Sequence, residues 1–225
     1  MEEAEDKINQ RSSGVLTKEE ILERLGTGNN DLRLFFTPMI DKNGQVGPST
    51  LDIRLGTQFI IFRRTMYPIL DVCEGDAKDL DWKIGAYQEK ICKPLGQRLV
   101  LHPQQLVLGC SLEYIKLPSD LIAEVIGRSS WGRLGLIISA ATVVHPCYAG
   151  VITLELANEG DTPLALYPGI RIAQLIFHKL AKTEEKLSIS SSKYACSVEP
   201  SFSRLHKDKD LEAIRNLKKK RESHS

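Results

Sequence analysis

Apolar and polar residues follow two different patterns along this chain, and the first predicts a short helix near the N-terminus. Thr17 and Glu20 stand at the start of a segment in which Ile21 and Leu25 recur at helical spacing. A Thr followed by Glu three residues later is typical of a capping box, in which each side chain accepts a backbone N–H group at the helix start. We therefore expect a helix over residues 18 to 25.

The second pattern consists of short apolar runs that Gly, Pro, Asn and Asp interrupt, and it fills residues 48 to 182. Such punctuated runs are typical of an all-β barrel or sandwich, so the predicted fold class is mainly β. Residues 67 to 95 are less regular, as expected of an insertion or a long excursion between strands. The predicted strands cover residues 51 to 55, 58 to 62, 106 to 108, 121 to 126, 151 to 156 and 170 to 177.

The last residues are hydrophilic and carry a second helical pattern. Leu211, Ile214 and Leu217 recur at helical spacing and lead into the basic run Lys218 to Arg221. The pattern predicts a marginal C-terminal helix with a basic end. That end is expected to be a solvated terminus, and contact with nucleic acid or an acidic partner is the alternative.

Size and composition indicate one domain between two polar ends. The 225 residues, 42% of them hydrophobic, provide one substantial core, which gives an arm at 1 to 16, a domain at 17 to 208 and a basic tail at 209 to 225. Thirty basic and 29 acidic residues leave a formal charge of +1, so nucleic acid is not an expected partner. The five cysteines form no Cys-X-X-Cys pair, which argues against a disulfide framework or a zinc ribbon. No signal segment or run of about 18 apolar residues is found, so we expect a cytoplasmic location without membrane contact.

Candidate anion-binding chemistry is concentrated at residues 127 to 133, between two apolar runs. Arg128 and Arg133 flank Ser129 and Ser130 in the sequence Gly-Arg-Ser-Ser-Trp-Gly-Arg. Backbone N–H groups, hydroxyls and guanidinium forks in such a turn suit phosphate oxygens. The alternative is an ordinary polar turn in which one of the arginines pairs with a surface carboxylate.

A second candidate is Glu155, which stands in an otherwise apolar predicted strand. Strand alternation puts it on one face with Val151 and Thr153, while Ile152, Leu154 and Leu156 take the other face. The carboxylate is either on a solvated sheet face or in a partly desolvated site, where it can take a proton from water near neutral pH.

Other stretches accompany these two segments in a defined order: residues 32 to 34, 37 to 38, 49 to 56, 101 to 103, 158 to 160, 168 to 169, 171 to 175 and 193 to 205. Together they resemble the dCTP deaminases and their bifunctional deaminase-dUTPase relatives, over most of residues 17 to 208. The resemblance implies a dUTPase-like β-barrel or jelly-roll-type fold with a short N-terminal helix and a C-terminal tail. It also implies a homotrimer with sites at the subunit interfaces, in which a monomer is inactive.

The same resemblance implies a role for each matching residue. Glu155 would be the general base that activates water for attack on C4 of cytosine, with Ser129 and Arg133 holding the water and the developing charge. Arg128 and Ser130 would meet the triphosphate with its Mg²⁺, Lys193 would reach it from the tail, and no zinc would take part. His145 and Cys147, the nearest candidate pair for zinc, stand alone. The full set of expected substrate contacts is Arg128, Ser129, Ser130, Trp131, Gly132, Arg133, Ala141, Thr142, His145, Thr153, Leu154, Lys193 and Ser197.

This sequence departs from the family pattern at several positions. His145 replaces an Asp that contacts the sugar and helps to activate water in dUTPases, which weakens a pyrophosphohydrolase reading. The loop before it is one residue shorter than in the bacterial enzymes, which leaves Ala141 or Thr142 near the cytosine amino group. Ser197 stands where a Gln is frequent, and Trp131 replaces a smaller apolar residue.

Three functions follow from these observations. The first is deamination of dCTP to dUTP and ammonia, with dTTP as a regulator. The second is a dUTP diphosphatase or a bifunctional enzyme that ends at dUMP, which the stretch Arg171 to Leu175 favours and His145 disfavours. The third is a nucleotide-binding sensor with little turnover. The presence of Glu155, Ser129 and Arg133 counts against it, because a protein that only binds does not need this catalytic set.

Overall fold

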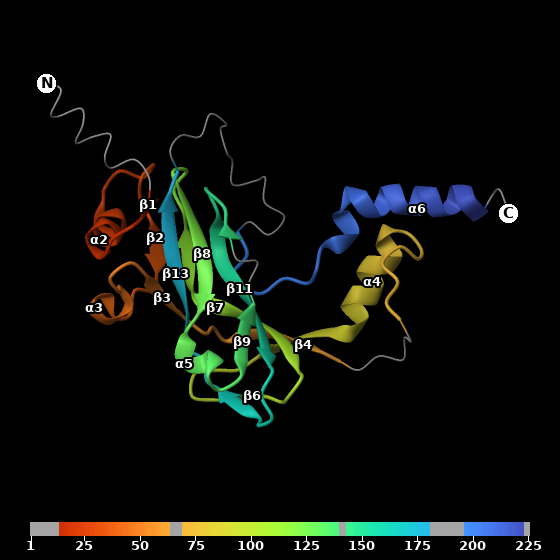
Figure 1. Ribbon diagram of the computed structural model, residues 1–225, viewed down its shortest axis with the longest axis horizontal. Helices are drawn as coiled ribbons and strands as arrows, with labels where there is room; N and C mark the ends of the chain where they lie inside the picture. The colour runs from red at the N-terminus through yellow and green to blue at the C-terminus, as the bar shows by residue number, and fades with distance from the viewer. Residues whose placement is uncertain (1–13, 64–68, 140–142, 181–195, 223–225) are drawn as a thin grey trace, which may run out of the picture.

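The computed structural model describes residues 14–63, 69–139, 143–180 and 196–222, and these residues form two facing β-sheets with short helices at one side (Figure 1). One sheet has the order β1-β13-β8-β10, with β3 paired to β13. The other has the order β5-β4-β7-β11-β9, with β2 paired to β7, and β6 pairs with β12 in a small third sheet. All of these pairings are antiparallel, and the predicted mainly β class is confirmed.

The first sheet consists of β1 (Gly14–Val15), β3 (Leu51–Arg54), β8 (Leu121–Gly127), β10 (Val143–Val144) and β13 (Arg171–Lys179). The second consists of β2 (Phe35–Thr37), β4 (Gln58–Phe62), β5 (Gln88–Cys92), β7 (Leu106–Lys116), β9 (Leu136–Ser139) and β11 (Ala149–Asn158). The small sheet pairs β6 (Leu99–Leu101) with β12 (Leu164–Leu166).

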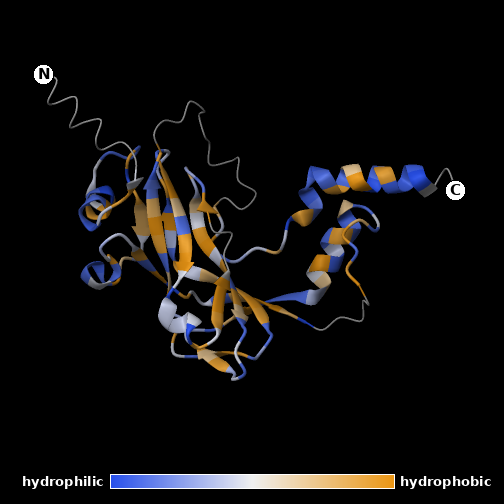
Figure 2. Cartoon of the chain, viewed as in Figure 1, coloured by the Kyte–Doolittle hydropathy of each residue, from blue (hydrophilic) through white to orange (hydrophobic). Residues whose placement is uncertain are grey.

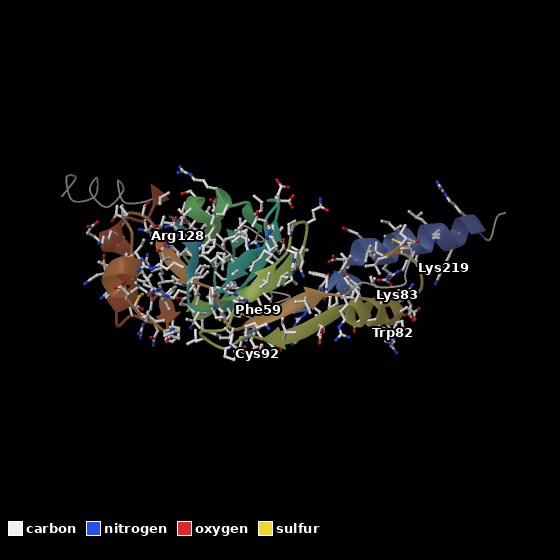
Figure 3. The ribbon with its side chains drawn as sticks, turned by 90° about the horizontal axis from the view of Figure 1, so that it is seen from below. Phe59, Trp82, Lys83, Cys92, Arg128 and Lys219 are labelled. Atoms are coloured by element: carbon white, nitrogen blue, oxygen red, sulfur yellow. The ribbon has the colours of Figure 1, made fainter. Side chains whose placement is uncertain are left out.

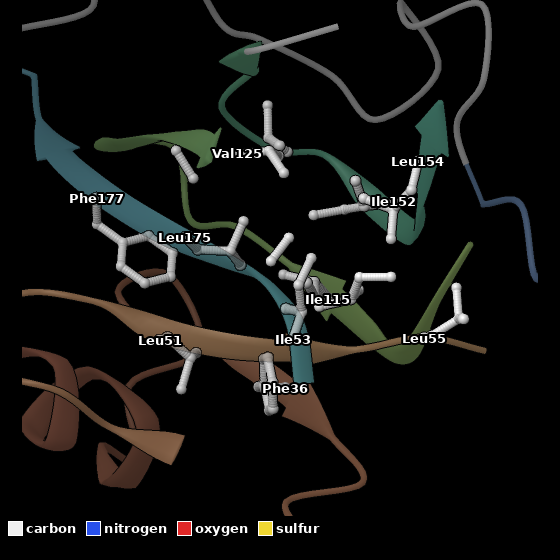
Figure 4. Packing of buried hydrophobic residues seen from close by; sticks show 14 of the residues in the cluster. Phe36, Leu51, Ile53, Leu55, Ile115, Val125, Ile152, Leu154, Leu175 and Phe177 are labelled. Carbon is white, nitrogen blue, oxygen red and sulfur yellow. The ribbon is translucent and has the colours of Figure 1, made fainter. Parts of the chain in front are cut away.

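The hydrophobic core lies between the two large sheets, and both contribute to it. Figure 4 shows Leu175 and Phe177 of β13 facing the same interior as Ile152 and Leu154 of β11. Apolar residues are concentrated on the strands, as the orange colour in Figure 2 shows. The alternation predicted for β11 is present, since Ile152, Leu154 and Leu156 are buried while Glu155 is exposed.

β7 is much longer than the three-residue run that the sequence predicts. Its inward positions include Ser111 and Glu113, which are buried polar residues that interrupt the apolar pattern. The Ser111 hydroxyl donates to the Glu113 carbonyl at 2.7 Å and accepts the Ile152 N–H at 2.9 Å. Hydrogen bonds to these polar side chains therefore stabilise the middle of the strand. The polar residues also interrupt the apolar alternation, so hydrophobic periodicity does not predict this part of β7.

The predicted N-terminal helix is confirmed as α2 (Lys18–Gly26). Thr17 Oγ1 accepts the Glu20 N–H at 3.3 Å, and Glu20 Oε2 accepts the Thr17 N–H at 2.9 Å, which completes the expected capping box. Ile21 is fully buried against the sandwich. A second short helix, α3 (Lys42–Gln45), carries the buried side chain of Gln45 and was not expected from the sequence.

Residues 69 to 87 and the C-terminal residues together form a helical lobe beside the sandwich. The lobe comprises α4 (Ala77–Tyr87), a turn of 3₁₀ helix η2 (Leu205–Lys207) and α6 (Lys209–Glu222). Leu80, Ile84 and Leu211 form its own small buried cluster. The irregular interval thus contains a helix and β5, and the predicted C-terminal helix is confirmed. Among the described helices, none has the length and apolar character needed to cross a membrane.

Candidate active site

The Gly-Arg-Ser-Ser motif forms the turn between β8 and β9. β8 ends at Gly127, Arg128 remains extended, and α5 (Ser129–Gly132) makes one helical turn that Arg133 closes. The first N–H groups of such a turn have no partner within the helix, so they are available to an anion. Ser129, Ser130 and Arg133 are exposed. The predicted hydroxyl and guanidinium groups are thus presented together on one short helix.

Trp131 anchors this turn to the sandwich. Its ring packs against the main core, and its indole N–H donates to the carbonyl oxygen of Arg171 at 3.0 Å. At the other end of the turn, Gly135 has a φ of +88° and lies so close to Gly160 that a Cβ atom would be 2.7 Å from the Gly160 nitrogen. A residue with a side chain at Gly135 would therefore displace the link from α5 to β9.

The Arg128 side chain reaches across β13 to a buried carboxylate on β3. Its Nη1 lies 3.4 Å from Oδ2 of Asp52, whose side chain is only 7% exposed. The other Asp52 oxygen, Oδ1, accepts the Gln174 side-chain N–H at 2.7 Å. The pairing of Arg128 with a carboxylate, raised above as the alternative reading, is thus present, but the carboxylate is buried and the arginine is one-third exposed.

Glu155 lies near the middle of β11, with Leu108 of β7 on one side and Ser139 of β9 on the other. α5 adjoins the opposite end of β9, where Leu136 pairs with Asn158. Asn158 is three positions along the strand from Glu155, which corresponds to about 10 Å. Within the described part of the chain, no hydrogen bond or ion pair joins Glu155 to Ser129 or Arg133. The structure therefore does not bring the predicted base and its two predicted helpers together in one chain.

The loop before β11 is held by Tyr148. Its hydroxyl donates to the Val151 carbonyl at 2.6 Å, and burial raises the pKa of Tyr148 to about 12, so the hydroxyl keeps its proton at neutral pH. His145, where the family resemblance led us to expect an Asp, is exposed, and its carbonyl accepts the Tyr148 N–H at 3.2 Å. Cys147 between them has a φ of +61°. His145 is therefore on the surface of a fixed turn.

Comparison with known proteins decides the family. A family model described as dCTP deaminase-like matches residues 15–180. The chain belongs to the dCTP deaminase-like family. The predicted enzyme class, a dCTP deaminase-type hydrolase, is confirmed by this match and by the relatives.

Three relatives of this family illustrate the similarity. A dCTP deaminase of Halorubrum lacusprofundi is 39% identical and the match covers 93% of this chain and 100% of that protein. A "dCTP deaminase, dUMP-forming" of Methanobrevibacter smithii is 37% identical, over 88% of this chain and 98% of that protein. The crystal structure of the 2'-deoxycytidine 5'-triphosphate deaminase from Agrobacterium tumefaciens matches with a TM-score of 0.56 at 24% identity, over 75% of this chain and 49% of that chain. This structural likeness supports the predicted fold.

The remaining residues expected from the family resemblance differ in their surroundings. Thr153 is half-buried, whereas the Leu154 side chain is fully buried in the core, so Leu154 can offer a substrate only its backbone. Ala141, Thr142 and Lys193 lie outside the described residues.

The C-terminal tail of this dCTP deaminase-like chain runs beside the start of β11. Cys196 N–H donates to the Ala149 carbonyl at 2.6 Å, and Val151 N–H donates to the Ser197 carbonyl at 2.8 Å. The Ser197 hydroxyl is hydrogen-bonded to the carbonyl of Glu199. Ser197 is thus hydrogen-bonded to Val151, which lies two residues before Thr153 on β11, the strand that carries Glu155.

Sequence reasoning missed Asp52 and Gln174 as candidates for the site. Both lie in stretches that resemble the family, but the pattern did not single out either residue from the apolar residues beside it. Gln174 and Asp52 are partners in the register of β13 and β3. For Asp52 the signal that was available is an acidic residue in a short predicted strand, since charged residues are seldom buried; Gln174 had no such signal.

Proposed function

We propose that this chain deaminates dCTP to dUTP and ammonia. The observation that carries the proposal is the exposed carboxylate of Glu155 on an apolar strand, in a family whose named relatives are dCTP deaminases. In the single chain Glu155 is on a solvated face and has no ion-pair partner among the described residues, so the partly desolvated setting that favours proton transfer has to come from the bound substrate and a second copy. The two serines and two arginines around α5 supply the donors that a nucleotide triphosphate needs.

In the proposed reaction Glu155 takes a proton from a water molecule as the water oxygen attacks C4 of cytosine. The C4–N bond then breaks, and the leaving nitrogen receives protons to depart as ammonia, so the net reaction is hydrolysis. Ser129 and Arg133 stabilise the developing charge. Arg128, Ser130 and Lys193 bind phosphate oxygens, and Mg²⁺, carried by the triphosphate, neutralises part of its charge.

The donors around α5 fit phosphate oxygens rather than a metal ion. Serine hydroxyls and guanidinium groups donate hydrogen bonds, whereas Mg²⁺ prefers carboxylate and carbonyl oxygens or water. We infer that the protein meets the ion only through the nucleotide. In this proposal Trp131 and Gly132 shape the turn, Ala141 or Thr142 and the Thr153–Leu154 backbone contact the cytosine base, and His145 and Ser197 contact the nucleotide.

We infer further that the site is complete only between subunits of a homotrimer. Glu155 and α5 lie at different ends of the β9–β11 pair, about 10 Å apart along the strand, which is beyond direct hydrogen bonding between Glu155 and Ser129. An α5 from a second copy that approaches Glu155 supplies Ser129 and Arg133 to it. A variant mixture tests this: inactive Glu155→Gln and inactive Ser129→Ala subunits, unfolded and refolded together, are expected to regain part of the activity.

A second candidate is a bifunctional enzyme that continues to dUMP and pyrophosphate. The names of two relatives favour it, since the proteins of Methanobrevibacter smithii and Dictyoglomus thermophilum are both called dUMP-forming. His145 stands against it, because an exposed imidazole on the turn before β11 replaces the expected carboxylate.

The first experiment incubates the purified protein with dCTP and, separately, with dUTP in Mg²⁺, and follows ammonia release and the nucleotide products by ion-exchange chromatography. Conversion of dCTP to dUTP that disappears in Glu155→Gln supports the first proposal, and a fall of about 10²–10⁴-fold is expected for loss of a general base. Formation of dUMP supports the bifunctional candidate. Binding of dCTP without any product would contradict both and leave a nucleotide sensor.

A further inference from the structure

Asp52, Arg128, Arg171 and Gln174 form a polar cluster at the end of β8, next to the Gly-Arg-Ser-Ser turn. Asp52 is on β3, Arg171 and Gln174 are on β13, and Arg128 follows β8. β13 lies between the other two strands, so three neighbouring strands contribute to the cluster. Figure 3 labels Arg128 at the sandwich end of the molecule, far from Trp82 and Lys219 of the helical lobe.

The two arginines of the cluster are held very differently. Arg171 Nη1 donates to the Gly44 carbonyl at 2.7 Å, its Nη2 lies 3.2 Å from Asp41 Oδ2, and its Nη1 lies 3.4 Å from Asp52. Arg128 contacts Asp52 alone among the side chains that the structure describes, at 3.4 Å. A guanidinium has five N–H donors, so most of the Arg128 donors remain for another ligand.

Asp52 itself is fixed before either arginine is considered. Gln174 donates to its Oδ1 at 2.7 Å, and the buried position of the side chain on a paired strand leaves it little room to turn. Its Oδ2 is therefore a rigid acceptor next to a partly exposed arginine. The Arg128–Asp52 contact is an ion pair at 3.4 Å, and a fixed negative charge beside one edge of a guanidinium favours orientations in which the other edge faces a ligand. Such preorganisation reduces the entropy lost when a ligand binds.

We propose that Asp52, clamped by Gln174, is a positioning residue that orients the Arg128 guanidinium toward the phosphate chain of the nucleotide. The inference rests on the proposed function of Arg128 in triphosphate binding. A carboxylate near phosphates also repels them, but Arg171 and Arg128 together offset the charges of Asp41 and Asp52. Loss of orientation is therefore expected to outweigh loss of repulsion.

The test compares Asp52→Asn with Asp41→Asn in the full-length protein. Both remove one carboxylate that pairs with Arg171, but only Asp52 also pairs with Arg128. Asp52→Asn is expected to raise the KM for dCTP about tenfold with kcat within about threefold, and to weaken binding of inorganic tripolyphosphate in Mg²⁺ by a similar factor in calorimetry. Asp41→Asn is expected to leave both values within about twofold.

A double-mutant cycle separates positioning from a general effect on the fold. In an Arg128→Ala background, Asp52→Asn is expected to change tripolyphosphate binding less than about twofold, since its effect passes through Arg128. An equal loss in both backgrounds, or no loss in the wild-type background, would overturn the proposal. Gln174→Ala, which keeps the carboxylate but removes its clamp, gives the same cycle if Asp52→Asn does not fold.

The calorimetric arm also distinguishes this inference from the proposed function. If the wild-type protein binds tripolyphosphate through Arg128 but releases no ammonia from dCTP, deamination fails while the Asp52 proposal stands. If Arg128→Ala binds tripolyphosphate as tightly as the wild type does, Arg128 is not a phosphate ligand, and the Asp52 proposal is overturned together with that role.

Discussion

Glu113 shows how a buried charge is accommodated at the scale of a single residue. Its side chain is fully buried in β7, where it accepts the Arg54 backbone N–H at 2.8 Å and the Gln45 side-chain N–H at 3.2 Å. Burial nevertheless raises the pKa of Glu113, because the desolvation of the carboxylate outweighs these hydrogen bonds and the nearby Arg54. The carboxylate joins β7 to β3 and to α3 at a cost that depends on pH.

That cost gives a prediction for the pH dependence of stability. Since the pKa in the folded state is raised above 4.5, the folded protein holds a proton that the unfolded chain has lost, and the contribution of Glu113 falls as the pH rises above 4.5. Glu113→Gln does not titrate. Its free energy of unfolding in urea, relative to the wild type, is therefore expected to increase between pH 4 and pH 8.

Glu89→Gln is the matched control for this prediction. Arg63 lowers the pKa of Glu89 through a hydrogen bond at 2.8 Å, so this carboxylate contributes stability above pH 4.5 that is lost on acidification. The stability of Glu89→Gln relative to the wild type should thus decrease, or stay level, as the pH rises. A fall with pH for Glu113→Gln as well would contradict the assigned role of burial.

Single residues were predictable from the sequence when their type stands out from a regular pattern. Thr17 and Glu20 were found because a capping box is local. Glu155 was found because it interrupts an apolar strand. Gln45 and Glu113 were not found, because these two partners are 68 residues apart in the sequence and no local pattern indicates their contact. Whether Glu155 meets Ser129 was equally beyond the sequence, because it depends on strand register and on the assembly.

At the scale of elements, the helical lobe depends on a small number of side chains. α6 has a mainly polar surface, and Leu211 is its buried contact with Leu80 and Ile84 of α4. Arg215 adds a hydrogen bond of 2.9 Å to the Val72 carbonyl. Propensity alone rarely stabilises a helix of this length, so docking accounts for most of its stability.

Leu211→Ala is therefore expected to destabilise the lobe by about 2 kcal/mol, the lower end for a buried Leu in a small cluster. Hydrogen exchange of the α4 and α6 amides should accelerate, while the amides of β11 and β13 keep their protection. Leu217→Ala, at a position that is 62% exposed, is the control and should change exchange little. Equal acceleration in both variants would mean that Leu211 does not hold the lobe.

The strands were predictable where apolar runs are bounded by turn residues, as for β4 and β13. The excursion at residues 67 to 95 resisted prediction because α4 has only two buried residues, Leu80 and Ile84, and a weak pattern follows from so little burial. The partner of α4 is also more than a hundred residues away, in α6.

At the scale of the whole molecule, most of the stability comes from the hydrophobic core between the two large sheets. Phe177 on β13 is fully buried there, within the packing that Figure 4 shows. Phe177→Ala is expected to lower the free energy of unfolding by about 3–5 kcal/mol, measured in urea. Phe35→Ala is the control, because Phe35 is 38% exposed and packs at the edge, against Tyr114 with ring centroids 6.5 Å apart. Its loss should cost about 1 kcal/mol, and a similar value for Phe177→Ala would contradict a single shared core.

The projecting helical lobe has a practical consequence for protein engineering. In Figure 1 the last turn of α6 points away from β11 and from α5. A fluorescent protein or a surface linker fused after α6 would therefore stand clear of β11 and of α5. Immobilised through this end, the protein would keep β11 and α5 away from the support.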